Sequence, residues 1–474
     1  MSPLAGAPFL VILSGWCAGI SLSTRVSPCV ASLAGVLFSA GFLLVSTKRL
    51  PPGWERFLPV LFLAVALPLY FMSLRLHPEA VAEVSWKGQA RIGTERSWGS
   101  RRAVTLESPK GRLLCMLKPE DRPLEGVKIQ VAGRLVPLEK IFHSFSKGGF
   151  DPVRYWRAKG VEAGFVCSSA VAVDSPGNRK TAWRTRLRKK LLLTMPPLLR
   201  GHLLAAWTGE RDPEIADMHR RWGTAHLLAV SGFHVGILAA VLLWCLRGFR
   251  FKLLLCSTLL WGYVFLTGCA SSACRAMVMI QLALLGPVLA GRPSSGLNSV
   301  SVAGGLLLLI NPWVFWDVGW RLSVISALIL CSIGQGGLSP LRGLAASLAI
   351  WTGTAGEATA AFEAIPVSGL VLNPLALPAF SFLLPVASIA AAPALFGFPG
   401  GWAPLWGMEG VFEIWVRFAD FVCWIVPWQI GFSPALWNLS AAVLGGAIAY
   451  GLKTGLINGL LLILCASFCG SVFH

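Results

Sequence analysis

Two histidines, a serine and two glycines interrupt an apolar stretch near the middle of the chain. The stretch AHLLAVSGFHVGIL contains, in order, His226, Ser231, Gly232, His234 and Gly236. These residue types could bind a metal, form a serine–histidine nucleophile pair, or line a polar passage. On a continuous helix the two histidines would be two turns apart, about 12 Å, which is too far to share one ion. Because no acidic residue is fixed nearby to orient the histidine, we favour a polar lining or helix packing over metal binding or hydrolysis.

A charged segment containing Arg211 and Asp212 runs into this stretch without a polar linker. Polar, glycine-broken helix at the start of an apolar run is typical of segments that line water, because lipid-exposed backbone must satisfy its own hydrogen bonds. The sequence therefore predicts a broken helix at Ser231 and Gly232.

Charged residues recur inside later apolar segments, where charge is costly unless it faces a cavity or a partner. Arg275 has no acidic neighbour in sequence and lies among small residues, so we expect it to line a passage. Asp317 precedes Arg321 by four residues, a helical spacing at which the two could form an ion pair. A phosphate-guiding role for Arg321 is the alternative.

The elements that must position these residues are mostly apolar. Hydrophobic residues make up 55% of the 474 residues and charged residues 13%, with a mean hydropathy of +0.66, which excludes a soluble globular protein. Apolar runs of about 20 residues recur through 1–75 and 201–474. We predict an α-helical polytopic membrane protein with about 10–12 membrane segments, some of them broken or re-entrant. No basic stretch precedes the first run, so we expect it to be retained rather than cleaved.

Residues 76–178 form a polar region with five short β-rich runs separated by turn clusters. We predict an inserted OB-like β domain, although five strands could also form an open sandwich. Basic loops at Lys48–Arg56 and at 247–252 are expected in the cytoplasm, which puts this domain on the extracytoplasmic face. Cys115 and Cys167 could form a disulfide there, or stay unpaired.

Positive charge is concentrated between Arg75 and Arg200, with 25 Lys and Arg against 11 Asp and Glu. Proteins that bind single strands without sequence preference combine a basic groove with aromatic stacking faces. The candidate residues in the β domain are Trp86, Arg91, Arg96, Trp98, Arg101, Arg102, Arg154, Tyr155, Trp156, Arg157 and Lys159. Alternatively, the aromatic side chains fill the core and the cations are solvated.

A basic amphipathic helix is predicted at 179–200, to lie on a membrane surface or against phosphates. Its candidate residues are Arg184, Arg186, Arg188, Lys189 and Lys190. Near the end of the chain, four charges share one helix face, which predicts an interfacial or pore-lining helix: Glu409, Glu413, Arg417 and Asp420.

AHLLAVSGFHVGIL resembles the most distinctive motif of the ComEC family of competence proteins. GGFDPVRYWRAKGVEAGF, LTGCASSACRAMVM, NPWVFWDVGWRLSVISAL and FEAIPVSGLVLNPLALP resemble further blocks of that family, in order and spacing. The blocks carry Thr267, Gly268, Ser272, Asn373 and Pro378 as motif positions. Where this chain has Arg321, the family commonly has Gln.

The resemblance implies a channel that brings single-stranded DNA across the bacterial inner membrane into the cytoplasm during natural transformation. The implied partners are membrane lipid, a DNA receptor, a cytoplasmic motor and a separate nuclease. The chain shows no phosphate-loop motif and no H-x-H-x-D-H cluster, so we expect no ATPase or nuclease activity of its own and no cofactor. A transporter of another anion, lipid or peptide, and an intramembrane hydrolase, are the alternatives.

Overall fold

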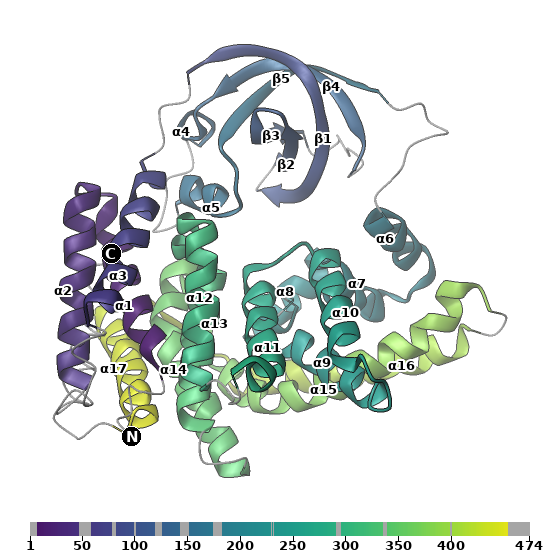
Figure 1. Cartoon of the computed structure of the whole chain (residues 1–474). Helices are drawn as coiled ribbons and strands as arrows, with labels where there is room; N and C mark the ends of the chain where they lie inside the picture. The colour runs from purple at the N-terminus through teal and green to yellow at the C-terminus, as the bar shows by residue number, and fades with distance from the viewer. Residues whose placement is uncertain are drawn as a thin grey trace. The chain divides into compact units, whose positions relative to one another are not determined.

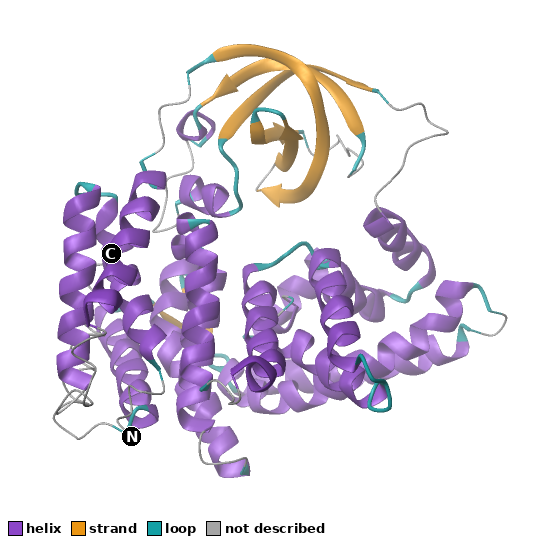
Figure 2. Ribbon diagram, in the orientation of Figure 1, coloured by secondary structure: helices purple, strands orange, loops and turns teal. Residues whose placement is uncertain are grey.

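The computed structural model describes most of the chain, which separates into two units. The described residues are 7–46, 58–77, 82–98, 101–118, 126–142, 151–173, 183–228, 230, 232–290, 295–334, 339–398 and 401–453. Helices dominate one unit, which combines residues 1–76 with 194–474 (Figure 1). Strands dominate the other unit, residues 77–193 (Figure 2). The strand-rich unit is thus inserted into the helical one.

Three apolar helices open the helical unit: α1 (Pro8–Ser23), α2 (Pro28–Ser46) and α3 (Leu58–Arg75). Small residues let α1 and α2 approach closely. A Cβ on Gly15 would lie 2.8 Å from the carbonyl oxygen of Gly35, and a Cβ on Gly35 would lie 2.7 Å from that of Gly15. Such contacts are typical of helix pairs in apolar surroundings. α1 and α3 also pack against α12 (Gly296–Ile310), where the Phe9 N–H donates to Asn298 Oδ1 at 3.2 Å.

The middle of the helical unit is a series of packed helices. α9 (Gly232–Cys245), α10 (Lys252–Leu266) and α11 (Ser271–Ala290) share an apolar core. α11 packs on α12 and α13 (Val318–Ile333), and α13 packs on α14 (Pro340–Phe362) and α17 (Pro434–Gly451). Ser440 fixes α17 on α14, since its Oγ accepts from the Gly356 N–H at 2.9 Å and donates to the Thr352 carbonyl at 2.7 Å.

The remaining helices surround the charged segment found in the sequence. α7 (Pro197–Thr208) and α8 (Pro213–Trp222) pack on α15 (Ser368–Phe396) and α16 (Ala403–Ile425). β6 (Ala364–Pro366) precedes α15 and β7 (Gln429–Gly431) follows α16, and these two strands pair antiparallel. The ribbon therefore closes the base of the α15–α16 hairpin. Two 3-10 segments, η3 (Ala225–Leu228) and η4 (Pro312–Trp316), lead into α9 and α13.

Two of the described helices, α3 and α15, are long and apolar enough to cross a bilayer. Other expected segments correspond to shorter apolar helical stretches. α9 has 14 residues, about 21 Å, against a hydrocarbon core of about 30 Å. The apolar stretch AHLLAVSGFHVGIL is therefore not one continuous helix, because its first residues form η3 and the break. The count of 10–12 segments stays a prediction.

The strand-rich unit contains a closed barrel with the strand order β1-β2-β3-β5-β4 (Figure 1). The strands are β1 (Val84–Trp98), β2 (Arg101–Ser108), β3 (Gly111–Leu117), β4 (Lys128–Val136) and β5 (Ala163–Ala172). β1 pairs antiparallel with both β2 and β4, and β3 meets β5 in parallel, which closes the sheet. The five predicted strands and the barrel are confirmed, and the open sandwich is wrong.

The long strand β1 serves two neighbours because it bends. Its register against β2 shifts between Ile92 and Glu95, and such bulges increase bend and twist. Gly93 lies in this bulge, where a Cβ would be 2.6 Å from Thr105 Oγ1. Leu113 and Phe165 are fully buried in the barrel core.

The segments around the strands also form three helices: α4 (Leu138–Ile141), α5 (Pro152–Ala158) and, after β5, α6 (Trp183–Thr194). Asp151 caps α5, since its Oδ1 accepts from the Val153 N–H at 2.9 Å. The single helix predicted at 179–200 is wrong at its C-terminal end. α6 ends at Thr194 and α7 begins at Pro197, because two consecutive prolines disfavour helix in the residues before them.

Candidate functional site

A break in the helix was predicted at Ser231 and Gly232, and the described residues on both sides confirm it. η3 ends at Leu228 and α9 begins at Gly232. The Val230 carbonyl between them accepts from Ser272 Oγ at 2.7 Å, which ties the break to α11. Ser231 lies outside the described residues, so the serine–histidine alternative stays a hypothesis.

The residues on either side of the break differ in environment. His226, in η3, is exposed, whereas His234, in α9, is buried. A Cβ on Gly236, one turn beyond Gly232, would meet no atom within 4 Å. Upstream, Arg211 is exposed. Asp212 caps α8, since its Oδ1 accepts from the backbone N–H of Glu214, two residues later, at 3.1 Å.

Thr267 and Gly268 form a tight turn between α10 and α11. Thr267 is buried and its Oγ1 donates to the Val264 carbonyl at 3.0 Å, while Gly268 has a φ of +82°. Gly209, at the end of α7, approaches so closely that a Cβ there would lie 2.6 Å from the Thr267 carbonyl oxygen. These motif residues therefore fix the end of α7 against α10.

Arg275 lies in α11 and is only 6% exposed. Its Nη2 donates to Ser323 Oγ on α13, and its Nη1 donates to Met279 Sδ at 3.5 Å. Its Nε has no hydrogen-bond partner, and no carboxylate of the described residues lies within 4 Å of its guanidinium. Each buried donor left without a partner costs about 1–3 kcal/mol. Arg275 is therefore a buried cation whose Nε–H has no hydrogen-bond acceptor.

The ion pair that Arg321 makes is with Glu357 on α14, not with Asp317. Arg321 Nη1 lies 3.1 and 3.3 Å from the two carboxylate oxygens of Glu357. Arg321 Nε also donates to the Phe315 carbonyl at 2.8 Å. The i,i+4 pairing is wrong because Asp317 has another role: it caps α13, and its Oδ2 accepts from Ser271 Oγ at 2.9 Å.

A pair of histidines that the sequence reasoning missed is buried between α7 and α8. His202 Nε2 lies 3.0 Å from His219 Nε2. His202 Nδ1 is 2.7 Å from the Leu198 carbonyl, which only accepts, so this nitrogen carries the proton. His219 Nε2 must then donate to His202, and His219 Nδ1 accepts from Thr224 Oγ1 at 2.8 Å. The partners thus define one neutral tautomer for each ring.

Burial keeps this pair neutral. The pKa of His202 is lowered to about 4 by loss of solvent, and that of His219 is lowered well below its ordinary value by the same cause and by the neighbouring ring. Neither α7 nor α8 is among the apolar stretches long enough to suggest a membrane segment. Seventeen residues and a helix–helix turn separate the two histidines, so no local spacing in the sequence indicates their contact.

α16 is anchored by two of the four charges predicted on its face. Glu409, 5% exposed, accepts from the backbone N–H groups of Leu198 and Leu199 at 2.9 and 2.8 Å, and so caps α7. Asp420 Oδ1 accepts from Trp222 Nε1 on α8 at 2.7 Å. Glu413 and Arg417 are exposed and 3.9 Å apart. The shared face of α16 is therefore divided between packing and solvent.

Two further motif positions lie in α15. Asn373 is half-buried, and its Oδ1 has no hydrogen-bond partner. Pro378 is exposed on the same helix. Both belong to a helix with prolines at four interior positions, each of which removes one intrahelical hydrogen bond.

In the strand-rich unit, the aromatic side chains proposed as stacking faces pack mainly on one another. Trp156 is 1% exposed, and its ring centre lies 5.4 Å from those of Trp98 and Tyr155. Trp86 is half-buried against Phe165, 5.7 Å away. The alternative of core aromatics is thus the arrangement observed, because burying these large rings gains more than leaving them in water.

Three of the six arginines proposed in the β domain form ion pairs within it. Arg102 pairs with Glu95, Arg154 with Asp151, and Arg157 with Glu139. Lys159 lies over the Tyr155 ring. Arg101 is exposed, and the side chains of Arg96 and Arg184 lie outside the described residues. In α6, Arg186, Lys189 and Lys190 are exposed and Arg188 is half-buried.

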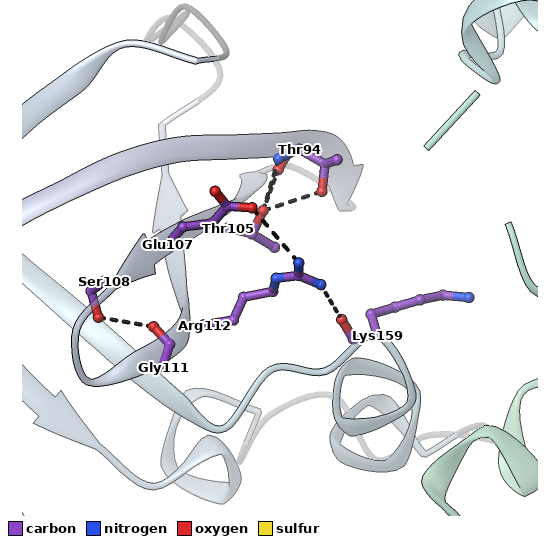
Figure 3. A network of polar contacts seen from close by, with 7 residues as sticks. All are labelled: Thr94, Thr105, Glu107, Ser108, Gly111, Arg112 and Lys159. Atoms are coloured by element: carbon purple, nitrogen blue, oxygen red, sulfur yellow. Dashed lines mark hydrogen bonds and ion pairs between the residues drawn. The ribbon is translucent and has the colours of Figure 1, made fainter. Parts of the chain in front are cut away.

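Figure 3 shows how one such arginine is used. Arg112, on β3, lies 3.7 Å from Glu107 on β2 and donates to the Lys159 carbonyl, which ends α5, at 2.8 Å. The contact ties α5 to the barrel. The Arg112 guanidinium is therefore used in contacts within this unit, and its charge is not evidence for a ligand site.

A different set of cations remains available on the outer face of β1 and β4. The register puts Arg91 directly opposite Lys128, and Lys87 and Arg134 share the outward alternation. All four are exposed, and none has a carboxylate within 4 Å in the part of the chain that the structure describes. We call these four residues the β1–β4 basic face. Sequence reasoning included only Arg91, although the two-residue period of KGQAR and KIQVAGR would have indicated the others.

No disulfide joins Cys115 to Cys167. Cys115 is buried in the barrel core, and Cys167 is half-buried with its Sγ 3.3 Å from the Ser169 carbonyl. The possible disulfide between these two residues is therefore not formed.

Comparison with known proteins gives a family match that covers the predicted motif residues of the helical unit. The family model described as competence protein matches residues 203–455. ComE operon protein 3 of Bacillus subtilis is 31% identical over 208 residues, which cover 41% of this chain and 26% of that protein. Recombination protein 2 of Haemophilus influenzae is 29% identical over 105 residues, 22% of this chain and 13% of that protein. The chain thus matches about a quarter or less of the length of these relatives. No solved structure matches it.

Proposed function

Because the chain belongs to the competence protein family, whose model matches more than half of it, we propose that it is an inner-membrane channel for single-stranded DNA. In this proposal the strand enters the cytoplasm during natural transformation. The barrel is of the OB type, whose sheets bind oligonucleotides in other proteins, and it receives the strand on the extracytoplasmic face. The helical unit conducts the strand, and it performs no catalytic step.

The β1–β4 basic face carries the proposal. Like charges directly opposite each other on neighbouring strands destabilise a sheet, and Arg91 and Lys128 are such a pair. Exposed cations without carboxylate partners are suited to a ligand of regular negative charge. A single strand supplies one phosphate per nucleotide and requires no sequence readout.

The membrane location rests on composition and on two helices. α3 and α15 have the length and hydropathy of membrane spans, and the shorter apolar helices would complete a multi-pass channel, some of them as broken or re-entrant segments. Basic loops at 47–57 and 247–252 favour the cytoplasm. A DNA receptor outside, and a motor and a nuclease inside, would be separate partner proteins.

The test is binding of a twenty-nucleotide thymidine strand to the full chain in nanodiscs, measured over a range of salt. Each lost phosphate contact should flatten the slope of log K against log salt by about 0.7. We expect this for Lys128→Gln and Arg134→Gln. Lys110→Gln is the matched control, because Lys110 is exposed in the β2–β3 turn, outside the basic face.

Equal slopes for all three variants would contradict the assignment of the face. Wild-type binding that follows the phosphatidylglycerol content of the nanodisc, and not the oligonucleotide, would contradict the DNA proposal and favour a lipid or another anion. Salt-sensitive binding together with protected uptake of labelled strand into proteoliposomes is the result that the proposal requires.

A further inference from the structure

The turn between α9 and α10 gathers three cations and three aromatic rings within nine residues. α9 ends at Cys245 and α10 begins at Lys252, and the two helices pack on each other (Figure 1). Every residue from 247 to 252 is exposed. The turn is nonetheless compact, since the Phe249 N–H donates to the Leu246 carbonyl at 2.9 Å. We call six side chains the basic-aromatic turn: Trp244, Arg247, Phe249, Arg250, Phe251 and Lys252.

The positive charge of this turn is not neutralised by the protein. The sequence contains no Asp or Glu from residue 218 to residue 316. In the part of the chain that the structure describes, no carboxylate lies within 4 Å of Arg247, Arg250 or Lys252. Three neighbouring cations without acidic partners repel one another, and this repulsion is relieved when anions lie among them. The turn is therefore suited to a surface of negative charge.

The aromatic rings of the turn are exposed as well. Trp244, Phe249 and Phe251 are 67%, 60% and 64% exposed. They continue the exposed apolar surfaces of the two helices, which carry Val241 on α9 and Leu254 on α10. Large rings clustered on a surface indicate an interaction site. Aromatic rings beside cations are typical of the level at which a bilayer meets water.

The placement of two guanidinium groups favours lipid over a nucleic-acid strand as the occupant. The Arg247 guanidinium lies over the Trp244 ring, 5.4 Å from its centre, and that of Arg250 lies over the Phe251 ring at 5.9 Å. A cation over a ring occupies a face on which a base would stack. Its N–H groups remain at the edge of the guanidinium plane, where they can donate to a phosphate oxygen.

The hairpin formed by α9 and α10 is short for a bilayer. The two helices have 14 and 15 residues, about 21–22 Å, against a hydrocarbon core of about 30 Å. Flanking residues that reach the interface are one way in which a bilayer accommodates such a helix. The basic-aromatic turn supplies these residues at one end of both helices.

We propose that the basic-aromatic turn is a binding site for anionic phospholipid headgroups. The cations bind the lipid phosphates, and the rings lie at the boundary between headgroups and acyl chains. The site selects net negative charge in the lipid, and phosphatidylglycerol is the probe for it. It requires the membrane location of the proposed function, and it does not depend on DNA transport.

The test is photo-crosslinking of the full chain in phosphatidylcholine nanodiscs that contain a small, fixed fraction of phosphatidylglycerol with a photoreactive headgroup. Mass spectrometry measures the labelling of the peptide that carries the turn. One cation near an anionic surface strengthens binding about fivefold, so Arg250→Gln should reduce this labelling about fivefold.

Arg25→Gln is the matched control and should leave the labelling of the turn unchanged. Arg25 is also an exposed arginine in a turn between two apolar helices, α1 and α2, but no basic or aromatic residue adjoins it in sequence. Because Arg25 and Arg250 are both exposed, neither variant should shift the unfolding transition followed by tryptophan fluorescence. A loss of labelling can then be assigned to the headgroup contact.

Three results would overturn the proposal. The first is equal labelling of the turn in Arg250→Gln and in wild type, and the second is equal labelling of wild type by photoreactive phosphatidylcholine. The third is loss of the lipid label when thymidine strand is added in excess, together with crosslinking of the strand to the turn, which would make the turn a contact for DNA.

Failure of this inference and failure of the proposed function give different results. If wild type binds no strand but keeps the lipid label at the turn, only the DNA channel is contradicted. If wild type binds the strand with the expected salt dependence and the turn is not labelled, only the headgroup site is contradicted.

Discussion

Removing either member of the Arg321–Glu357 pair should destabilise the helical unit, and removing both should not. Breaking a buried ion pair from one side costs about 3–5 kcal/mol, whereas replacing both members is about neutral. The side chains are 15% and 11% exposed, so solvent cannot replace the lost partner. The structure also predicts which single variant is worse.

The difference comes from the contacts that each residue keeps. In Glu357→Gln, Arg321 still donates to the Phe315 carbonyl at 2.8 Å and lies over the Phe315 ring at 5.3 Å. We therefore expect a loss near the lower end, about 3 kcal/mol. In Arg321→Gln, Glu357 loses the cation that both of its oxygens contact, and we expect about 5 kcal/mol. The double variant should lie within about 1 kcal/mol of wild type.

The assay is equilibrium unfolding of the full chain in mild detergent by titration with sodium dodecyl sulfate, followed by tryptophan fluorescence. The matched control is the cycle at Arg417 and Glu413, whose side chains are 83% and 54% exposed. That pair should couple by less than about 0.5 kcal/mol. Additive losses in the Arg321–Glu357 cycle would refute the reasoning, as would a double variant that is less stable than either single one.

Three further changes test other contacts. Acidification from pH 6.5 to about 4 should destabilise the protein, because in that window His202 binds a proton in the unfolded chain but not in the folded one, where its pKa is about 4. The expected loss in the free energy of unfolding is about 3 kcal/mol, and it should be smaller in His202→Gln. The same pH profile in wild type and His202→Gln would exclude the effect. Glu409→Gln should cost about 1–2 kcal/mol and speed amide exchange at the start of α7 only; unchanged exchange there would refute the cap. Gly209→Ala should destabilise the protein by about 2 kcal/mol, since the φ of Gly209 is +69° and a Cβ there would lie 2.6 Å from the Thr267 carbonyl oxygen. Gly262→Ala is the control and should be tolerated, because a Cβ on Gly262 would meet nothing within 4 Å. Equal losses of stability in the two variants would contradict the contact.

The parts of the fold that depend on neighbouring residues could be predicted from the sequence. Short β-rich runs separated by turn clusters predicted all five strands, and the Ser231-Gly232 interruption predicted the break before α9. Pro196 and Pro197 indicate the end of α6, so the local sequence itself disfavours one continuous helix over 179–200.

The parts that depend on residues far apart could not be predicted. Glu357 is 36 residues from Arg321. Nothing in the local sequence favours Glu357 as the partner of Arg321 over Asp317, which precedes Arg321 by four residues. Only the structure shows that Asp317 is used elsewhere, as the cap of α13. His202 and His219 meet only because α7 and α8 fold back on each other. The aromatic residues could serve as core or as stacking faces, and only the packing of Trp156 decides between them.

The insertion of the barrel has a consequence for biosynthesis. α1 and α3 complete their packing against α12, which begins at residue 296, about 220 residues after α3 ends. At about 5–20 residues per second, a ribosome needs roughly 10–45 s to reach it. During that interval the first three helices have only one another, and the reciprocal Gly15–Gly35 contact holds two of them together. A bulky residue at Gly35 would therefore act during synthesis. It would separate α1 from α2 before α12 has been made, and so expose the nascent helices to membrane quality control.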